Sequence, residues 1–218
     1  MNSGNVALFT RTKVLQIEDQ SEQYVVHTSR GAIRACHVVN ATEAYTLALH
    51  PQFHDLVRPL QAQSAAGRGG PLRLPSDLSV SSALWFGDRR GEHVLFGTYA
   101  TRIPDGVADQ NRPSRFLTEC ALGEMMSCTG RFAMEVPHEW SGAMGLTADE
   151  YPLVGLIDGK RQYLIGGMCG SGNGAAFNAG RCVVNSDLGG SEDPDDYLPE
   201  YFAPSRLLDP ASQPWPDC

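Results

Sequence analysis

The sequence predicts an α+β fold in which a glycine-rich turn joins a buried strand to a helix. Near the C-terminal end, the apolar residues 163–165 run through Gly166 and Gly167 into the glycine-rich stretch 170–174. Apolar residues then recur at helical spacing from Ala175 onward. Earlier in the chain, short runs rich in β-branched and aromatic residues alternate with turn residues, which is typical of antiparallel strands. Together these patterns indicate mixed sheets with few helices.

The first 40 residues predict three strands joined by short turns. Residues 14–17 and 24–28 flank an acidic, polar turn, and a second turn at Arg30-Gly31 leads to a predicted third strand over 32–40. Such a meander needs a partner layer to be stable. Val38 and Val39 are interpreted as core residues of the third strand.

The middle of the chain predicts a short helix, a hairpin and a longer helix. The helix covers residues 43–49 and ends before Pro51, and a strand follows over 58–64. A Gly/Pro/Arg-rich loop at 67–75 is the predicted crossing between two lobes. Residues 82–86 and 93–96 flank a turn at 87–91 and so predict a hairpin.

A polar linker at 100–113 precedes the longer helix. Ser114 is its predicted N-cap, and the helix runs to Cys128, followed by a strand over 132–140. The residues on its apolar side are Phe116, Leu117, Ala121, Leu122 and Met125.

Composition excludes several classes of protein. The net charge of −8 argues against nucleic acid or an anionic membrane surface as the main partner. No apolar run approaches the roughly 20 residues of a membrane-spanning helix, and the first residues lack the pattern of a signal peptide. The six cysteines form no CxxC pair, so neither a zinc site nor a disulfide framework is predicted. We expect a cytoplasmic protein with reduced thiols and no metal.

The glycine-rich turn is the strongest candidate for a ligand site. A helix that begins at such a turn presents free backbone N–H groups at the positive end of its dipole, which suits an anionic or electron-rich ligand. A simple tight turn is the alternative, because a glycine run alone is weak evidence. The neighbouring Cys169 is interpreted as a small filler. Asp149 is interpreted as a turn organiser rather than as half of a catalytic pair with Glu150.

Three motifs near the C-terminal end carry a family resemblance. The sequence reads WSGAMGLTADEYPLVG, then YLIGG, then GSGNGAAF. Their order and spacing resemble the C-terminal part of FAD-dependent oxidoreductases of the D-amino-acid oxidase (DAO), glycine oxidase and sarcosine oxidase superfamily. Residues 31–45 resemble the family strand that returns to the nucleotide-binding domain, and residues 58–64 resemble the strand that crosses into the substrate domain. The tail ending at Arg206 resembles a terminal motif that packs back on the body.

The resemblance implies a substrate-binding domain with a mixed, largely antiparallel sheet, and the C-terminal part of an FAD-binding Rossmann-like domain. Residues 1–57 and 141–190 would form the partial FAD-binding lobe, residues 58–140 the substrate lobe, and residues 191–218 a C-terminal tail. The family's opening GxGxxG loop and its acidic ribose-binding residue have no counterpart in the sequence. We therefore expect the chain alone to bind FAD weakly, and an oligomer or a second chain is a candidate source of the missing half.

The resemblance also implies an activity, the oxidation of an amine or amino-acid C–N bond by hydride transfer to flavin. Trp85 and Arg90 would lie in the substrate cavity, which Trp85 would share with Trp140, and Asn173 would polarise the flavin. A core tryptophan and a solvated hairpin arginine are the alternatives. Glycine at 142, where covalently flavinylated relatives carry cysteine, implies non-covalent FAD. The positions implied to bind FAD are Val14, Ala41, Thr42, Gly142, Gly167, Gly170, Ser171, Gly172, Asn173 and Gly174.

A different class of function stays open. A non-catalytic or flavin-free paralogue would act as a partner module, or would use the same cavity for non-redox chemistry. The absent GxGxxG favours this alternative, whereas the intact glycine-rich turn favours the oxidoreductase.

Overall fold

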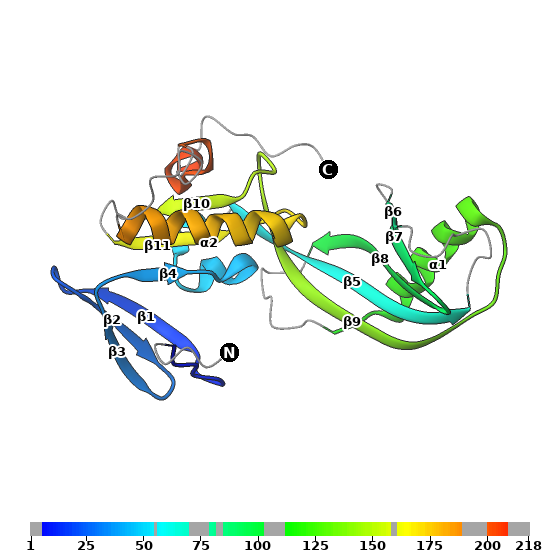
Figure 1. The fold of residues 1–218 in the computed structure, drawn as a ribbon, viewed down its shortest axis with the longest axis horizontal. Coiled ribbons are helices and arrows are strands. Elements are labelled where there is room, and N and C mark those ends of the chain that lie inside the picture. The colour runs from blue at the N-terminus through cyan, green and yellow to red at the C-terminus, as the bar shows by residue number, and fades with distance from the viewer. Residues whose placement is uncertain are drawn as a thin grey trace.

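A computed structural model describes residues 6–54, 56–69, 79–81, 85–102, 112–157, 161–188 and 200–208. Two parts of the molecule are joined by two long antiparallel strands, β5 (Val57–Gly69) and β9 (Met134–Thr147). One part holds two three-stranded sheets and helix α2, and the other holds a five-stranded sheet and helix α1 (Figure 1). The fold is α+β, as the sequence predicts.

The N-terminal meander consists of β1 (Val14–Asp19), β2 (Tyr24–Thr28) and β3 (Gly31–Ala35), paired antiparallel in that order. The prediction of one third strand over 32–40 is wrong. The chain leaves this sheet after Ala35 and enters a second sheet as β4 (Val38–Asn40), where Val39, predicted as a core residue, is 46% exposed.

Hydrogen bonds from a distant strand explain that break. β4 pairs in parallel with β11 (Gln162–Gly166). The Val38 N–H donates to the Arg161 carbonyl at 3.1 Å, and the buried Asn40 side-chain amide donates to the Tyr163 carbonyl at 2.9 Å. Residues 38–40 are therefore held by a segment more than 120 positions away, which no local pattern indicates.

The second sheet has the order β10-β11-β4, with β10 (Leu153–Leu156) antiparallel to β11. Helix α2 (Gly172–Leu188) lies along β10 and β11 (Figure 1). It begins three residues before the predicted Ala175, inside the glycine-rich stretch. Its inner face packs on the sheet through a core made of Val154, Tyr163, Ile165, Met168, Ala179 and Val183.

The third sheet has the order β6-β7-β8-β5-β9, where β6 is Ser79–Ser81, β7 is Trp85–Arg90 and β8 is His93–Arg102. The hairpin is confirmed, but the predicted turn at 87–91 is too long. Arg90 pairs with His93, which leaves a two-residue loop that starts at Gly91. Its φ of 59° is the value that the first position of a type II′ turn requires.

Helix α1 (Arg115–Thr129) covers one side of this sheet. Ser114 is its N-cap by backbone geometry, yet the Ser114 side chain makes no capping hydrogen bond. The buried Gln63 of β5 holds the helix start instead. Its Oε1 accepts from the Ser114 N–H at 2.6 Å, and its Nε2 donates to the Thr118 hydroxyl at 2.6 Å.

The core beneath α1 follows the predicted apolar face with one exception. Ala65, Val94, Phe96, Ala121 and Met125 form the buried cluster. Phe116, predicted on the apolar side, is instead 70% exposed. Alternation and helical spacing identify the face as a whole, but a residue at its edge turns to solvent.

The remaining described elements are short 3₁₀ helices, namely η1 (Glu43–Ala48), η2 (Pro51–Phe53), η4 (Glu200–Phe202) and η5 (Pro204–Leu207). The predicted helix at 43–49 is therefore a 3₁₀ helix. The tail through Arg206 packs back on the body, as predicted. Residues 67–69 of the predicted crossing loop are instead the end of β5, and the crossing between the two parts is made by β5 and β9. The rest of that loop, most of the linker at 100–113 and the last ten residues lie outside the described residues.

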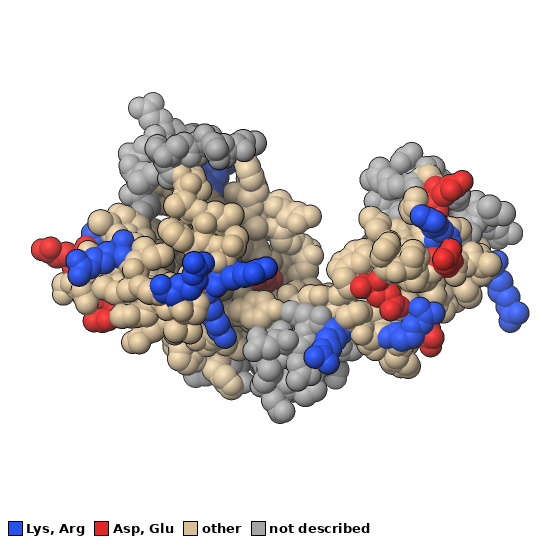
Figure 2. All heavy atoms as spheres, turned by 90° about the horizontal axis from the view of Figure 1, so that it is seen from below, with Lys and Arg blue, Asp and Glu red and all other residues tan. Residues whose placement is uncertain are grey.

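The described surface carries charges of both signs. On the face shown in Figure 2, Lys and Arg side chains and Asp and Glu side chains occur on both parts of the molecule. That face therefore lacks the uniformly basic character of a nucleic-acid-binding surface. Within the described ranges, no helix is long and apolar enough to cross a membrane. The same residues contain no group of three His, Cys, Asp or Glu side chains that could hold a metal ion.

Candidate functional site

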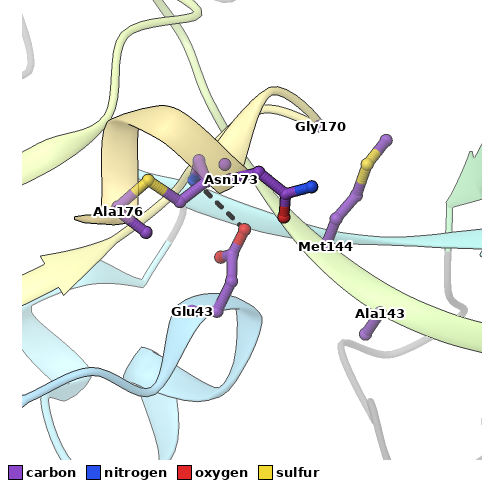
Figure 3. Close-up of a pocket in the computed structure, with 8 residues that line it drawn as sticks. Glu43, Ala143, Met144, Gly170, Asn173 and Ala176 are labelled. Carbon is purple, nitrogen blue, oxygen red and sulfur yellow. Dashed lines mark hydrogen bonds between the residues drawn. The ribbon is translucent and has the colours of Figure 1, made fainter. Parts of the chain in front are cut away.

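A cavity of about 430 Å³ opens where α2 begins, between the helix start, β9 and η1 (Figure 3). Its volume falls within the range of about 300–1,000 Å³ that is usual for small-molecule sites. The residues that line it are Glu43, Ala143, Met144, Met168, Gly170, Gly172, Asn173 and Ala176.

The glycine-rich turn brings the start of α2 close to β9. Gly170 has a φ of 82°, and a Cβ placed there would lie 3.3 Å from the Met144 Sδ. A Cβ on Gly172 would lie 3.1 Å from the Met168 Cβ, and the Ser171 N–H donates to the Met168 carbonyl at 3.0 Å. Side chains at these positions would crowd Met144 and Met168, both of which line the cavity.

Asn173 is the polar side chain that the first turn of α2 offers to the cavity. It is exposed and projects between Glu43 and Met144 (Figure 3). At Gly174, an added Cβ would meet no atom within 4 Å. The N–H groups of a first helical turn have no partner inside the helix and carry the positive end of its dipole. This edge of the cavity can therefore donate hydrogen bonds to an electron-rich group.

Glu43 is the ionisable side chain among the lining residues, and the sequence did not single it out. Its carboxylate accepts three backbone hydrogen bonds. Oε2 accepts from the N–H groups of Gly145 at 3.0 Å and Gly167 at 3.1 Å, and Oε1 accepts from the N–H group of Met168 at 3.1 Å. We call these three N–H groups the amide cradle. Since they come from distant segments, only the folded chain shows that Glu43 belongs to the site.

Two titratable groups near the turn are shifted toward their neutral forms. Burial raises the pKa of the Glu43 carboxyl, and the three amide hydrogen bonds oppose this shift without cancelling it. Burial also raises the pKa of the Cys169 thiol, against smaller effects of its contacts with Thr147. The thiol donates to the Gly167 carbonyl at 3.1 Å. A protonated, hydrogen-bonded thiol is a poor nucleophile, which agrees with the interpretation of Cys169 as a filler.

Asp149 organises the turn before β10, as predicted. Its Oδ1 accepts from the Tyr151 N–H at 3.1 Å, and both its oxygens accept from the Arg206 guanidinium, at 2.7 and 3.0 Å. Burial opposes ionisation, but the hydrogen bonds from Arg206 and Tyr151 outweigh it and lower the pKa of the Asp149 carboxyl. The pair fastens the tail to the body and lies outside the cavity lining.

The predicted cofactor-binding residues lie at different distances from the cavity. Gly170, Gly172 and Asn173 line the cavity, Ser171 lies in the same turn, and Gly167 belongs to the amide cradle. Near them lie three further predicted positions: Ala41 and Thr42 directly before Glu43, and Gly142 next to the lining residue Ala143. Gly174 follows Asn173 in the first turn of α2. Val14 lies in the separate N-terminal sheet, opposite Thr28.

Only the backbones of Trp85 and Arg90 belong to the described residues. Trp85 pairs with Thr98, Thr98 with Gln63, and Gln63 with Ser141. The Trp85 backbone therefore lies level with Ser141 of β9, two residues from Ala143. Three interstrand spacings, or about 14 Å, separate the Trp85 and Ser141 backbones. Its side chain lies outside the description. A cavity shared by Trp85 and Trp140 stays a prediction, and Trp140 is not among the lining residues.

Arg90 lies at the other end of the sheet. Arg90 pairs with His93, His93 pairs with Arg68, and Arg68 pairs with Glu135 of β9. Glu135 is eight residues, or about 26 Å, along β9 from Ala143. The structure does not bring Arg90 to this cavity.

A family profile and several solved structures match the chain. The profile described as DAO, FAD dependent oxidoreductase, matches residues 2–186. Glycine oxidase from Geobacillus kaustophilus is 20% identical, with a TM-score of 0.73 over 90% of this chain and 52% of that chain. L-proline dehydrogenase from P. horikoshii is 18% identical, with a TM-score of 0.64 over 90% and 54%.

A third similar structure is iminodiacetate oxidase from Chelativorans sp. BNC1. It is 15% identical, with a TM-score of 0.68 over 87% of this chain and 52% of that chain. The chain therefore spans about half the length of these structures. At such identities the likeness is one of fold. No curated protein matches the sequence.

Proposed function

We propose, because this chain belongs to the DAO family of FAD-dependent oxidoreductases, that it forms the substrate-facing part and the flavin-ring end of an amine or amino-acid oxidoreductase. The observation that carries the proposal is the cavity at the start of α2. A helix N-terminus lined by glycine there faces a strand that continues into the five-stranded sheet. Cofactor and substrate would meet between these elements.

The residues present fit one end of FAD. The open side of Gly174 and the absence of side chains at Gly170 and Gly172 let a flat ring approach the helix start. The other end of the cofactor requires backbone donors around its pyrophosphate, which the family takes from a GxGxxG loop. The 218 residues contain no such motif. The chain therefore supplies a site for the isoalloxazine ring and none that we can assign for the ADP moiety.

In this proposal the α2 side of the cavity would contact the flavin ring, and the β9 side would contact the substrate. When bound, FAD supplies the hydride acceptor, and the redox chemistry belongs to the cofactor. Asn173 and the N–H groups of the first turn of α2 would donate hydrogen bonds to the oxygen at the pyrimidine end of the ring, where they stabilise negative charge. Met144 and Ala143 form the wall on the β9 side, against which an amine or amino-acid substrate would be shielded from water.

The edge of β4 is the place we propose for the ADP-binding half of the fold, whether another segment or a second chain supplies it. β4 is an edge strand in the order β10-β11-β4, and its pairing with β11 is parallel, as in Rossmann-like sheets. Val39 on β4 is 46% exposed. Further parallel strands would cover this apolar edge.

One observation favours a second candidate function, a flavin-free protein that uses the cavity for non-redox chemistry. The Glu43 carboxylate lies in the cavity lining and occupies three backbone donors. When ionised, it places a negative charge beside the electron-rich end of a flavin ring. The two candidates differ in whether a flavin binds at all.

Titration of the purified chain with riboflavin and with FAD, followed by flavin fluorescence, separates these candidates. One or two hydrogen bonds contribute about 0.5–1.5 kcal/mol each, well short of the roughly 8 kcal/mol of micromolar binding. We expect both compounds to bind equally and more weakly than micromolar, because the ADP moiety has no assigned site. Stoichiometric FAD absorbance after desalting of the chain alone would contradict this division of the site.

Two asparagines on α2 provide a matched pair for the ring site. Asn173→Ala should weaken riboflavin binding, whereas Asn178→Ala, an exposed position five residues further along α2, should not. Equal effects would exclude the proposed role of Asn173. Adding the N-terminal half of a related enzyme should restore flavin absorbance and amine-dependent peroxide formation. If neither flavin binds even then, the flavin-free candidate is supported.

A further inference from the structure

The amide cradle gathers three N–H groups from two segments that are not neighbours in sequence. Gly145 belongs to β9, whereas Gly167 and Met168 directly follow β11. All three donate to the carboxylate of one residue, Glu43, at 3.0 to 3.1 Å. These distances are ordinary for N–H···O bonds. Convergence of several backbone donors on one point is how proteins bind oxyanions without a positively charged side chain.

The backbone is shaped for an oxygen atom at this point. A Cβ on Gly145 would lie 2.5 Å from the Glu43 Oε2 and 3.2 Å from the Gly167 Cα. Gly167 has a φ of 60°, and a Cβ there would lie 2.7 Å from the Thr147 Cγ2. The carboxylate therefore fills the space that glycine leaves at position 145, whereas Thr147 closes the space beside Gly167.

Glu43 reaches the cradle from an unfavourable backbone conformation. Its φ is 49°, in the left-handed region that side-chain-bearing residues seldom adopt. Within the described part of the chain, no lysine, arginine or histidine pairs with its carboxylate. The Cys169 thiol is an ionisable neighbour of this carboxylate, and it carries no positive charge. The cradle thus holds an anion through backbone dipoles alone.

We propose that the amide cradle is an oxyanion-binding site beside the cavity, which Glu43 and Met168 line, and that the Glu43 carboxylate is its resident anion. A ligand carboxylate, or another anionic oxygen, reaches these donors only after Glu43 has left them. While Glu43 is in place, the cavity selects neutral or cationic ligands, such as amines, over small carboxylic acids. This assignment concerns the chain's own residues and holds whether or not a flavin binds.

The test replaces the resident anion with one from solution. Glu43→Gly removes the carboxylate and relieves the left-handed backbone. Glu150→Gly is a matched control, because Glu150 is exposed and has a φ of 60°. Thermal unfolding is followed in sodium formate, sodium acetate and sodium chloride at equal ionic strength. We expect formate, and acetate less strongly, to raise the Tm of Glu43→Gly saturably by several degrees relative to chloride. Wild type and Glu150→Gly should show no difference among the salts.

No specific response of Glu43→Gly to formate would overturn the proposal. Because that variant could fail to fold, amide NMR of the wild-type chain provides an independent measurement. The signals of Gly145, Gly167 and Met168 should shift together with pH, with one apparent pKa. In Glu43→Gln this common titration should disappear. Three amides that titrate separately, or not at all, in the wild type would also overturn it.

Discussion

The two ends of β9 are held in different ways. At the end that starts with Met134, the strand packs on an apolar core, in which Phe96 and Met125 are fully buried. At the end that contains Gly145 and Thr147, it is held by directed hydrogen bonds. The Glu43 carboxylate accepts from Gly145, and the Thr147 hydroxyl donates to the Tyr151 carbonyl at 2.8 Å.

We expect the stability contributed by the apolar end to be independent of pH, and the stability contributed by the polar end to depend on pH. Apolar burial is non-directional and depends on volume. Hydrogen bonds to carboxylates depend on protonation state and on geometry. Variants of the apolar end should therefore lose stability equally at neutral and acidic pH, whereas variants of the polar end should change how stability depends on pH.

The largest effect should come from the apolar end. Phe96→Ala removes a side chain with no solvent exposure and should lower the free energy of unfolding by about 3–5 kcal/mol. Leu95→Ala, at the neighbouring position with 41% exposure, should cost less than about 1 kcal/mol. Urea denaturation at pH 7 and pH 5.5 measures both. A loss for Phe96→Ala that differs markedly between the two pH values would contradict the comparison.

The next effect concerns the pair that fastens the tail. Both side chains of Asp149 and Arg206 are largely buried, with 13–14% exposure. Asp149→Asn should therefore cost about 2–3 kcal/mol. The pKa of Asp149 is lowered in the folded state, so its contribution is present above the unfolded pKa and is lost as the pH falls through the folded value. The wild type should lose this part of its stability in acid, and Asp149→Asn should not.

An exposed ion pair provides the control for that prediction. Arg115 and Glu119 lie one turn apart on α1, with about 60% exposure. Glu119→Gln should change the free energy of unfolding by less than about 0.5 kcal/mol. Equal costs at positions 119 and 149 would show that burial does not distinguish the two pairs.

Local patterns in the sequence predict the apolar end well. Helical spacing identifies the face of α1 through Leu117, Ala121 and Met125, and the alternation around Phe96 identifies the hairpin. These predictions are correct because each pattern depends only on residues that are close together in the sequence, within one helix or one hairpin. The glycines at 170–174 also predict a turn that opens a helix, and Gly170, with a φ of 82°, has the backbone conformation that favours glycine.

The polar end depends on partners that no local pattern can indicate. Residues 38–40 leave the meander because β11 binds them, and Gln63 replaces the predicted cap of α1 from 51 positions away. Glu43 reads as an ordinary acidic residue in the first turn of a short helix. Its role requires the positions of Gly145 and Gly167, which are 102 and 124 residues away.

A smaller effect should come from the backbone at position 43. Glycine adopts a φ of 49° without steric cost, and alanine does not, so Glu43→Gly should be more stable than Glu43→Ala by about 1 kcal/mol. The same two substitutions at Glu150, with a φ of 60°, should differ by a similar amount. Thermal unfolding in chloride measures both pairs. A much larger difference at position 43 than at position 150 would contradict the view that backbone conformation alone separates the two variants.

The smallest effect concerns His50, which is buried between η1 and η2 with its ring edge toward Phe53. Its Nε2 is buried and has no hydrogen-bond partner among the described residues, and burial lowers the pKa of the imidazole below its usual 6.5. The unfolded chain therefore binds a proton more readily than the folded one, and stability falls as the pH drops below about 6.5. His50→Leu should remove this slope, a change of less than about 1 kcal/mol between pH 6.5 and pH 5.5. The matched comparison is His138→Gln, which removes an exposed histidine instead of a buried one. Glu43 acts in the opposite sense, because its raised pKa makes its contribution grow as the pH falls. The slope is therefore measured in wild-type and Glu43→Gln backgrounds, where His50→Leu should have the same effect if the two groups titrate independently.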